Sequence, residues 1–446
     1  MGRGFKKVKR RIPWISHLIT KETASELRPS TGYLVRADRT RICILCRGAK
    51  NLCGRKICPV LLKYKRIRRT ISVVDRQIDG ASPPEIFVGR IGYPKVFVGP
   101  LLYPEKGDIE ILGIPELWSF RAIDEFLDVR LSLIRGMRKI DVRRPNRLGN
   151  FYDKIVDTVL SGRSVDAYAE LDRIYRSIII DPYVQPIGVG GPIKSLEISA
   201  KGTIMFLEKV FEDDDLRALD AMVYLYRSGI MVSKIIQGLS AGILGTKLER
   251  KLVPTRWSIT AVDCILSKWL RDNIIREKPI IGDYLVFEYS GLGDKFVVIL
   301  FPDTWKYEFI EIWWPGSSWN FFGNSIAIGG DYELHWGRTE YASIGGCYYA
   351  TRLAVTEYLS KIGRQAGVIV IREAYPEHYM PIGVWYVRES VRRALRSKPV
   401  KFQNFQEALR YALSKLRIDP KEVIESSNII KMKTAQKTLP EFLQSN

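Results

Sequence analysis

Four of the six cysteines lie within sixteen residues near the start of the chain, in the pattern Cys-x2-Cys-x6-Cys-x4-Cys. They are Cys43, Cys46, Cys53 and Cys58. The spacing of the first pair lets two thiolates converge on one tetrahedral ion, so we expect the four to hold one structural Zn²⁺. A site with four protein thiolates leaves no open position for water. The predicted zinc therefore orders a loop and performs no reaction.

Two other uses of these cysteines stay open from the sequence. Pro59 follows Cys58, as in the last cysteine of ferredoxin runs, so an iron–sulfur cluster is an alternative although the spacing differs. Disulfide bonds are a second alternative, because intracellular proteins of hyperthermophiles form them. The remaining cysteines, Cys264 and Cys347, lie in apolar stretches and are expected in a core.

Positive charge is concentrated in the same part of the chain. The 446 residues carry a net charge of +21, and residues 1–75 hold 20 Lys and Arg against 4 Asp and Glu. Lys and Arg displace condensed counterions from phosphates, so we expect this basic head to bind DNA. The candidates just after the cysteines are Lys63, Lys65, Arg66, Arg68 and Arg69. The alternatives are a solvated tail, contact with anionic lipid, and an RNA-binding role in translation.

Membrane insertion and secretion are not expected. No apolar run reaches the roughly 18–20 residues of a membrane helix, and the charged N-terminus lacks the apolar region of a secretory signal. We therefore expect a cytoplasmic, nucleoid-associated protein whose partners do not include a membrane.

The length of the chain and its apolar periodicity predict a multidomain α+β protein, because single cores stop growing at roughly 250–300 residues. The expected units are a basic arm (1–40), a zinc module (41–70), two domains (71–250 and 251–425) and a flexible tail (426–446). Two strands around the turn Gly92-Tyr93-Pro94 are predicted to form a hairpin. Further strands are expected at 283–289, 295–301, 307–314 and 367–373. Helices are expected at 116–140, 149–175, 203–245, 346–361, 386–397 and 403–416.

The C-terminal tail ends in an isolated apolar cluster on a polar background. From their spacing, Gln436, Leu439 and Phe442 are expected on one face of a single 3₁₀ turn, with Leu443 beside it. This pattern resembles the motif that carries replication and repair proteins to the sliding clamp (PCNA), although Leu443 replaces the usual second aromatic and Pro440 is unusual. A tail that folds back on its own body is the alternative.

Several motifs together resemble the archaeal Nre family of DNA-repair proteins. They are the cysteine module ending in Cys58-Pro59, the stretch FVGRIGYPKVFVGP (87–100), the phrase VPTRWSITAVD (253–263) and the clamp-binding tail. The resemblance covers nearly the whole chain. It implies an N-terminal and a C-terminal Nre domain, a zinc finger, interaction with the sliding clamp and a role in repairing DNA damage.

An enzyme acting on DNA or on a nucleotide cofactor is the alternative function. Arg256 and Ser258 precede a predicted helix, where an arginine and a helix N-terminus both favour anions. Glu340 and Glu373 lie within the loops at 332–378, so the four residues are expected to line one pocket. No HExxH, phosphate-binding-loop or nucleophile-elbow pattern supports a named enzyme class.

Overall fold

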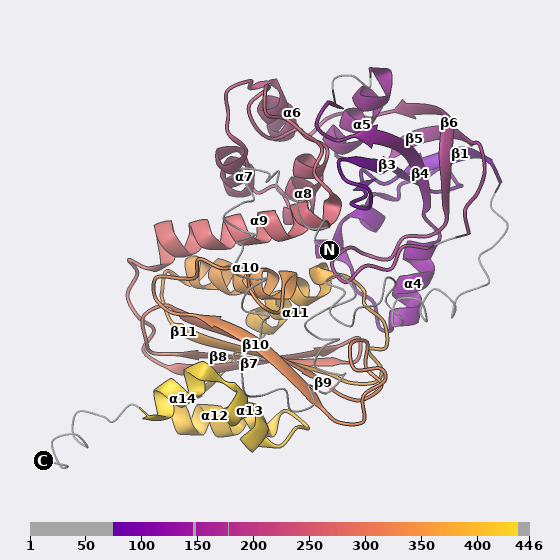
Figure 1. The fold of residues 1–446 in the computed structure, drawn as a ribbon. Helices are drawn as coiled ribbons and strands as arrows, with labels where there is room; N and C mark the ends of the chain where they lie inside the picture. The colour runs from indigo at the N-terminus through magenta and orange to yellow at the C-terminus, as the bar shows by residue number, and fades with distance from the viewer. Residues whose placement is uncertain (1–74, 146–148, 177, 436–446) are drawn as a thin grey trace, which may run out of the picture.

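The computed structural model describes residues 75–145, 149–176 and 178–435, arranged around two six-stranded sheets (Figure 1). The first, called here the N-terminal sheet, has the order β1-β5-β6-β4-β3-β2. Its strands are β1 (Gln77–Ser82), β2 (Ile86–Val88), β3 (Lys95–Leu102), β4 (Ile134–Asp141), β5 (Val165–Leu171) and β6 (Gly190–Ser199). Neighbouring strands are antiparallel, except that β4 and β6 are parallel. Two backbone hydrogen bonds between Ala81 and Tyr103 join the end of β3 to β1, so the sheet curls toward a ring.

The predicted hairpin is confirmed. Strands β2 and β3 pair antiparallel across the turn, with Phe87 opposite Gly99 and Val88 opposite Val98. Two predicted helices are wrong in part. The first contains only the short helix α4 (Ile123–Leu131) and then continues as β4, and the second contains α5 (Asn150–Leu160) and then β5. In both cases the apolar residues of the strand fall at spacings that also fit a helix.

The second sheet, called here the C-terminal sheet, has the order β10-β9-β11-β8-β7-β12. Its strands are β7 (Tyr284–Gly291), β8 (Asp294–Phe301), β9 (Lys306–Trp313), β10 (Ala327–Glu333), β11 (Gly367–Ala374) and β12 (Val400–Phe402). The four predicted strands of this sheet are confirmed, and the edge strands β10 and β12 are additional. Strand β8 is buried along nearly its whole length, as expected of a strand that is covered on both faces.

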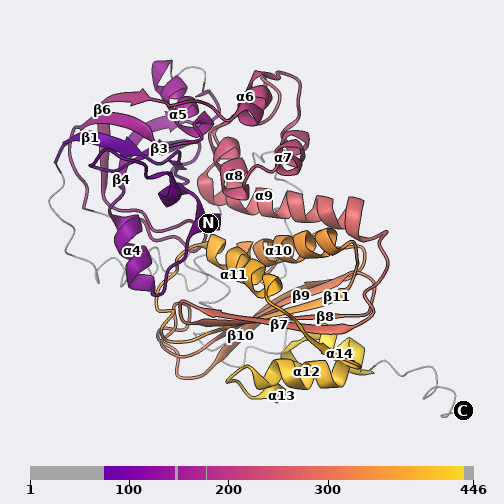
Figure 2. The same ribbon diagram turned by 180° about the vertical axis from the view of Figure 1, so that it is seen from behind.

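Helices cover both faces of the C-terminal sheet (Figures 1 and 2). Helices on one side are α9 (Thr255–Leu270), α10 (Gly346–Ile362) and α11 (Val384–Arg396). Helices on the other side are α12 (Phe405–Ser414), α13 (Pro420–Ser426) and α14 (Asn428–Ala435). The side chains of β8 alternate accordingly, since Val298 belongs to the core under α9–α11 and Val297 to the core under α12–α14. The three helices predicted from residue 346 onward are confirmed as α10, α11 and α12.

A single apolar core joins the two sheets. It runs from Val98 of the N-terminal sheet through Leu266 of α9 to Phe296 of the C-terminal sheet. Helices α6 (Met205–Glu212), α7 (Ala218–Arg227) and α8 (Val232–Ser240) fill the helical segment predicted at 203–245. Helices α7 and α8 pack against α9, and α6 packs against α7. The rings of Trp118 and Trp385 meet edge to face at 4.7 Å. The predicted α+β class is confirmed. The domain boundary expected at residue 250 lies in a part of the chain whose flanking elements share one continuous core.

Part of the range expected as the flexible tail is helical. Residues 428–435 form α14, whose Ile429 and Ile430 are buried against the C-terminal sheet. The carboxylate of Glu308 on β9 accepts hydrogen bonds from the backbone amides of Asn428 (2.7 Å) and Ile429 (3.1 Å). No helix among the described residues is long and apolar enough to cross a membrane.

Candidate functional site

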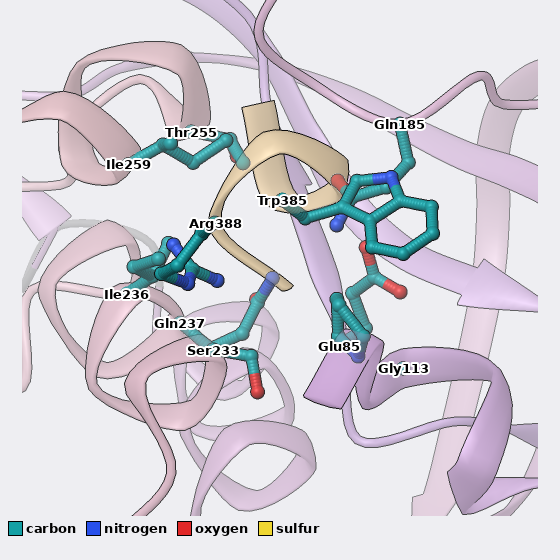
Figure 3. Close-up of a pocket in the computed structure, with 11 residues that line it drawn as sticks. Glu85, Gly113, Gln185, Ser233, Ile236, Gln237, Thr255, Ile259, Trp385 and Arg388 are labelled. Atoms are coloured by element: carbon teal, nitrogen blue, oxygen red, sulfur yellow. The ribbon is translucent and has the colours of Figure 1, made fainter. Parts of the chain in front are cut away.

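A small cavity lies where the N-terminal sheet meets helices α8, α9 and α11 (Figure 3). It is lined by Glu85, Gly113, Pro115, Gln185, Ser233, Ile236, Gln237, Thr255, Ile259, Trp385 and Arg388. Its volume of about 20 Å³ has room for one water molecule. Pockets that bind small molecules measure roughly 300–1,000 Å³, so a substrate does not fit this cavity.

Two polar side chains of the lining complete the edge of the N-terminal sheet. Strand β2 is the last strand of that sheet, so the amides on its free side lack a neighbouring strand. Gln237 of α8 accepts a hydrogen bond from the Ile86 amide at 2.9 Å, and Thr255 of α9 accepts one from the Val88 amide at 2.9 Å. A buried amide without a partner costs about 1–3 kcal/mol. These contacts therefore fix β2 to the helices.

Buried ion pairs border the same cavity. Arg130 of α4 donates to both carboxylate oxygens of Glu85, at 2.8 and 3.1 Å. Arg388 of α11 donates to Asp263 Oδ1 of α9 at 2.8 Å, and both side chains are at most 1 % exposed. Asp263 Oδ2 has no hydrogen-bond partner, and burial raises the pKa of this carboxyl to about 6. The cavity is thus a polar seam that holds the helices and the N-terminal sheet in register.

Arg256, a predicted pocket residue, lies in the first turn of α9. It donates to Asp181 Oδ2 at 2.8 Å, and its guanidinium carbon lies 3.8 Å from the ring centroid of Tyr183. The Tyr183 hydroxyl lies 3.3 Å from the Tyr341 hydroxyl. Arg256 therefore joins α9 to the loops that carry these tyrosines, and it is committed to a carboxylate of the chain itself.

The other predicted pocket residues have partners elsewhere, so the expected common pocket is wrong. Ser258 is buried and its hydroxyl lies 2.9 Å from that of Ser240. Glu373 is buried on β11, where it accepts hydrogen bonds from Trp314 Nε1 (2.8 Å) and from the backbone amides that precede α13. Glu340 lies in the loop after β10, where its backbone carbonyl accepts a hydrogen bond from Arg338. The four residues do not meet because they belong to different elements: Arg256 and Ser258 to α9, Glu340 to a loop and Glu373 to β11.

Ion pairs missed by the sequence analysis lie inside the C-terminal sheet layer. Arg372 of β11 donates to Asp294 Oδ2 at 2.7 Å and to Glu311 Oε1 at 3.1 Å. His378 Nδ1 lies 3.0 Å from the carbonyl oxygen of Leu292, and burial beside Arg372 lowers the pKa of this histidine well below its usual value. The ring is therefore neutral and donates to that carbonyl. The charges of these groups compensate one another, which is typical of a structural network, although Asp294 Oδ1 accepts no hydrogen bond from a described residue.

A surface groove of about 720 Å³ between α7 and α9 is a second hollow that the sequence did not reveal. It is lined by Leu219, Asp220, Val223, Tyr224, Arg227, Ser228, Trp269 and Asn273. The Arg227 guanidinium lies 6.0 Å from the Trp269 ring centroid, and Asp220 pairs with Arg217 at 2.8 Å. The groove therefore has a mixed lining, in which the apolar Leu219, Val223 and Trp269 lie beside polar residues and one charge of each sign.

The predicted zinc ligands, basic-head residues and clamp motif all lie outside the described residues. They are Cys43, Cys46, Cys53, Cys58, Lys63, Lys65, Arg66, Arg68, Arg69, Gln436, Leu439, Phe442 and Leu443. Within the described ranges, no group of three or more His, Cys, Asp or Glu side chains is placed to hold a metal ion. Cys347 is buried, as expected of a core residue, and Cys264 is partly buried.

Comparison with known protein families defines the class of this protein. Residues 52–320 match the N-terminal domain of archaeal Nre, and residues 333–442 match the C-terminal domain of archaeal Nre. The chain therefore belongs to the archaeal Nre family. The cavity lies between the two matched segments, since Trp385 and Arg388 come from the second and the other lining residues from the first.

Named relatives come from two archaea. The chain is 42 % identical over 407 residues to the DNA repair protein NreB of Archaeoglobus fulgidus, an alignment that covers 90 % of this chain and 100 % of the relative. It is 39 % identical over 381 residues to NreA of the same organism, covering 85 % of this chain and 94 % of the relative. It is 34 % identical over 345 residues to NreA of Haloferax volcanii, covering 74 % and 81 %. No solved structure matches the chain.

Proposed function

We propose that this protein is a DNA-repair factor that binds DNA through its basic head and is recruited to the sliding clamp through its C-terminal motif. The observation that carries the repair role is the 42 % identity to a protein named for DNA repair, over the full length of that relative. Both of the other relatives carry the same description. We further propose that the protein works in the cytoplasm at the nucleoid, where its DNA and clamp partners are.

The basic head is proposed as the main DNA contact. Residues 1–75 hold sixteen more Lys and Arg than Asp and Glu, whereas the remaining 371 residues hold only five more. One structural Zn²⁺ on the four clustered cysteines is proposed to shape this surface. The alternative function as an enzyme has less support, because Arg256, which was expected to bind its ligand, is paired with Asp181.

The DNA contact is tested by measuring duplex affinity over a salt series. The triple change Arg66→Ala, Arg68→Ala and Arg69→Ala is expected to weaken duplex binding. The slope of log affinity against log salt concentration should become shallower by about three, because three phosphate contacts are lost. The matched control removes three exposed cations of the body, Lys194, Lys201 and Lys401, which already pair with carboxylates. A duplex affinity of the wild type that does not change with salt would refute an electrostatic head.

The clamp contact is tested by a pull-down with a purified archaeal sliding clamp. Removal of residues 436–446 is expected to abolish binding, and Phe442→Ala is expected to weaken it strongly, because an aromatic anchor carries most of the energy of such a motif. Ser445→Ala lies outside the motif and serves as the control. Undiminished capture of the shortened chain would remove recruitment from the proposal. Zinc is tested by metal analysis of the purified protein and of a Cys43→Ser variant.

A further inference from the structure

One face of the N-terminal sheet carries exposed side chains where the first half of β3 pairs with the second half of β4, whereas Leu101 and Met137 farther along the same face are buried. Register places the residues of this face unambiguously. Phe97 lies opposite Lys139, Leu101 opposite Arg135, and Phe87 opposite Gly99. Cross-strand partners share a face, and residues two apart along a strand do so as well. We call the set Phe87, Lys95, Phe97, Arg135 and Lys139 the outer strip.

The aromatic members of the outer strip are accessible. Phe97 is 42 % exposed, although a phenylalanine in a sheet normally packs into a core. Phe87 is partly buried, and the opposite face of the same strands carries the buried Val88, Val96 and Val98. The exposed ring of Phe97 is therefore not needed to fill the core, whereas the ring of Phe87 packs partly against it.

The cationic members of the outer strip form no ion pair with a described residue, although Asp141, which pairs with Arg143 at 2.6 Å, lies opposite Lys95 on the same face. Lys95 and Lys139 are exposed and neither forms an ion pair there. Arg135 is 7 % exposed, its Nε has no hydrogen-bond partner, and no described carboxylate pairs with it. Its guanidinium carbon lies 5.9 Å from the ring centroid of Phe87, and burial lowers the pKa of Arg135 to about 10, so the group is still charged at neutral pH. A buried cation without an anion is costly, which favours an external anion at this position.

The other part of the same sheet has a different charge pattern. On β1, β5 and β6 the carboxylates pair with lysines, as in Glu170–Lys194 at 2.7 Å and Asp166–Lys201 at 3.0 Å. That surface is electrically balanced. The unpaired positive charge is therefore confined to the strands that also carry the exposed rings.

From this juxtaposition we infer that the outer strip binds unpaired DNA. The rings of Phe87 and Phe97 stack on bases, and Lys95, Arg135 and Lys139 contact the phosphates. A sheet face that combines rings with cations suits a single strand, because its bases have free faces, whereas the bases of a duplex are already stacked on one another. The inference rests on the proposed DNA-binding function and adds a second, strand-selective contact to the basic head.

The test measures the anisotropy of a fluorescein-labelled oligothymidine of about 20 nucleotides with the full-length protein, and of a blunt duplex of the same length. Phe97→Ala is expected to weaken oligothymidine binding about tenfold and to leave duplex binding unchanged, since each stacked base contributes on the order of 1–3 kcal/mol. Phe97→Trp should restore binding. Lys139→Ala should reduce the salt slope for oligothymidine by about one.

Tyr168→Ala is the matched control. Tyr168 is 41 % exposed on β5, on the same sheet, and lies opposite Asp79 and Glu197 instead of a lysine. The Tyr168→Ala variant is expected to bind both the oligothymidine and the duplex with the affinity of the wild type. Phe97→Ala that binds oligothymidine like the wild type overturns the inference, as does an equal loss in Tyr168→Ala or an equal loss of duplex binding.

The basic-head variant separates this inference from the proposed function. If the triple arginine variant loses affinity for both DNAs while Phe97→Ala loses none, the head is supported and the outer strip is overturned. If the wild type binds neither DNA, both proposals fail. Photocrosslinking of a bromodeoxyuridine-substituted strand to a peptide that contains Phe97 would support the outer strip directly.

Discussion

The C-terminal sheet carries helices on both faces (Figure 2), whereas the N-terminal sheet leaves Phe97, Lys95 and Lys139 of the outer strip exposed. Both faces of the central strands β8, β9 and β11 are buried and covered by helices, so the C-terminal sheet has no face left for a ligand. On β3 the residues alternate, with valines inward and a phenylalanine and a lysine outward. From this contrast we infer that the C-terminal layers act as a scaffold. We expect a binding surface on the strands whose buried and exposed side chains alternate.

Substitutions in the polar seam between the two sheets should lower the free energy of unfolding more than substitutions elsewhere in the molecule. Arg388→Ala leaves Asp263 buried without a counter-ion, so we expect the free energy of unfolding to fall by about 3–5 kcal/mol. Urea denaturation measures it. Arg217→Ala removes an exposed pair with Asp220 and should cost less than about 1 kcal/mol. Equal costs for the two variants would contradict the assignment of Arg388 to a buried pair.

Matched truncations compare the two sheets directly. Ile371 of β11 is fully buried under α12–α14, so Ile371→Ala is expected to cost about 2–5 kcal/mol. Phe97→Ala removes a larger side chain but an exposed one, and should cost less than about 1 kcal/mol. Chemical denaturation of both variants measures the difference. A cost for Phe97→Ala as large as that for Ile371→Ala would show that the outer strip is part of the core.

The pH dependence of stability tests the environment of Asp263. Burial raises the pKa of its carboxyl from 3.8 in the unfolded chain to about 6 in the folded protein, so the folded state binds the proton more tightly. The resulting stabilisation is fully present below about pH 4 and is lost as the pH rises through about 6, with a size on the order of 2–3 kcal/mol. Asp263→Asn does not titrate. The stability of the wild type relative to this variant should therefore decrease from pH 4 to pH 7, and a constant difference would contradict a raised pKa.

Weakening the contact that anchors α14 should have the smallest effect on stability, and the effect should be confined to that helix. Glu308→Gln keeps one carbonyl acceptor but loses the charge that receives three hydrogen-bond donors, namely the Ser427 hydroxyl and the amides of Asn428 and Ile429. We expect a loss of about 1–2 kcal/mol and faster hydrogen exchange of the α14 amides. Helix α10, on the far side of the sheet, is the internal control. Faster exchange in both helices would mean that α14 does not open independently.

The parts of the fold that were predictable have short-range signals. Strands β7, β8 and β9 are apolar runs bounded by Gly, Pro and Asp, and the β2–β3 hairpin surrounds a Gly/Pro turn. Strand β4 was mistaken for helix because its polar residues Arg138 and Lys139 interrupt the alternation. Strand β10 was missed because Gly329, Gly330 and Asp331 are poor strand formers, which an edge position tolerates.

The contacts of the candidate site were not predictable, because their partners lie far apart in the sequence. Arg256 is 75 residues from Asp181, and Arg388 is 125 residues from Asp263. Composition and periodicity carry no information about which buried charges meet. The same limit applies to the outer strip, since only the strand register shows that Phe97 and Lys139 share a face.

The core that runs from Val98 through Leu266 to Phe296 has a consequence for how this chain can change over generations. The two segments matched to Nre domains share that core and the seam at Asp263 and Arg388. Separating them would expose apolar surface and buried charge in both at once. The segments are therefore inherited as one unit: a gene that kept only one of them, or that exchanged one for a distant counterpart, would need to repack both.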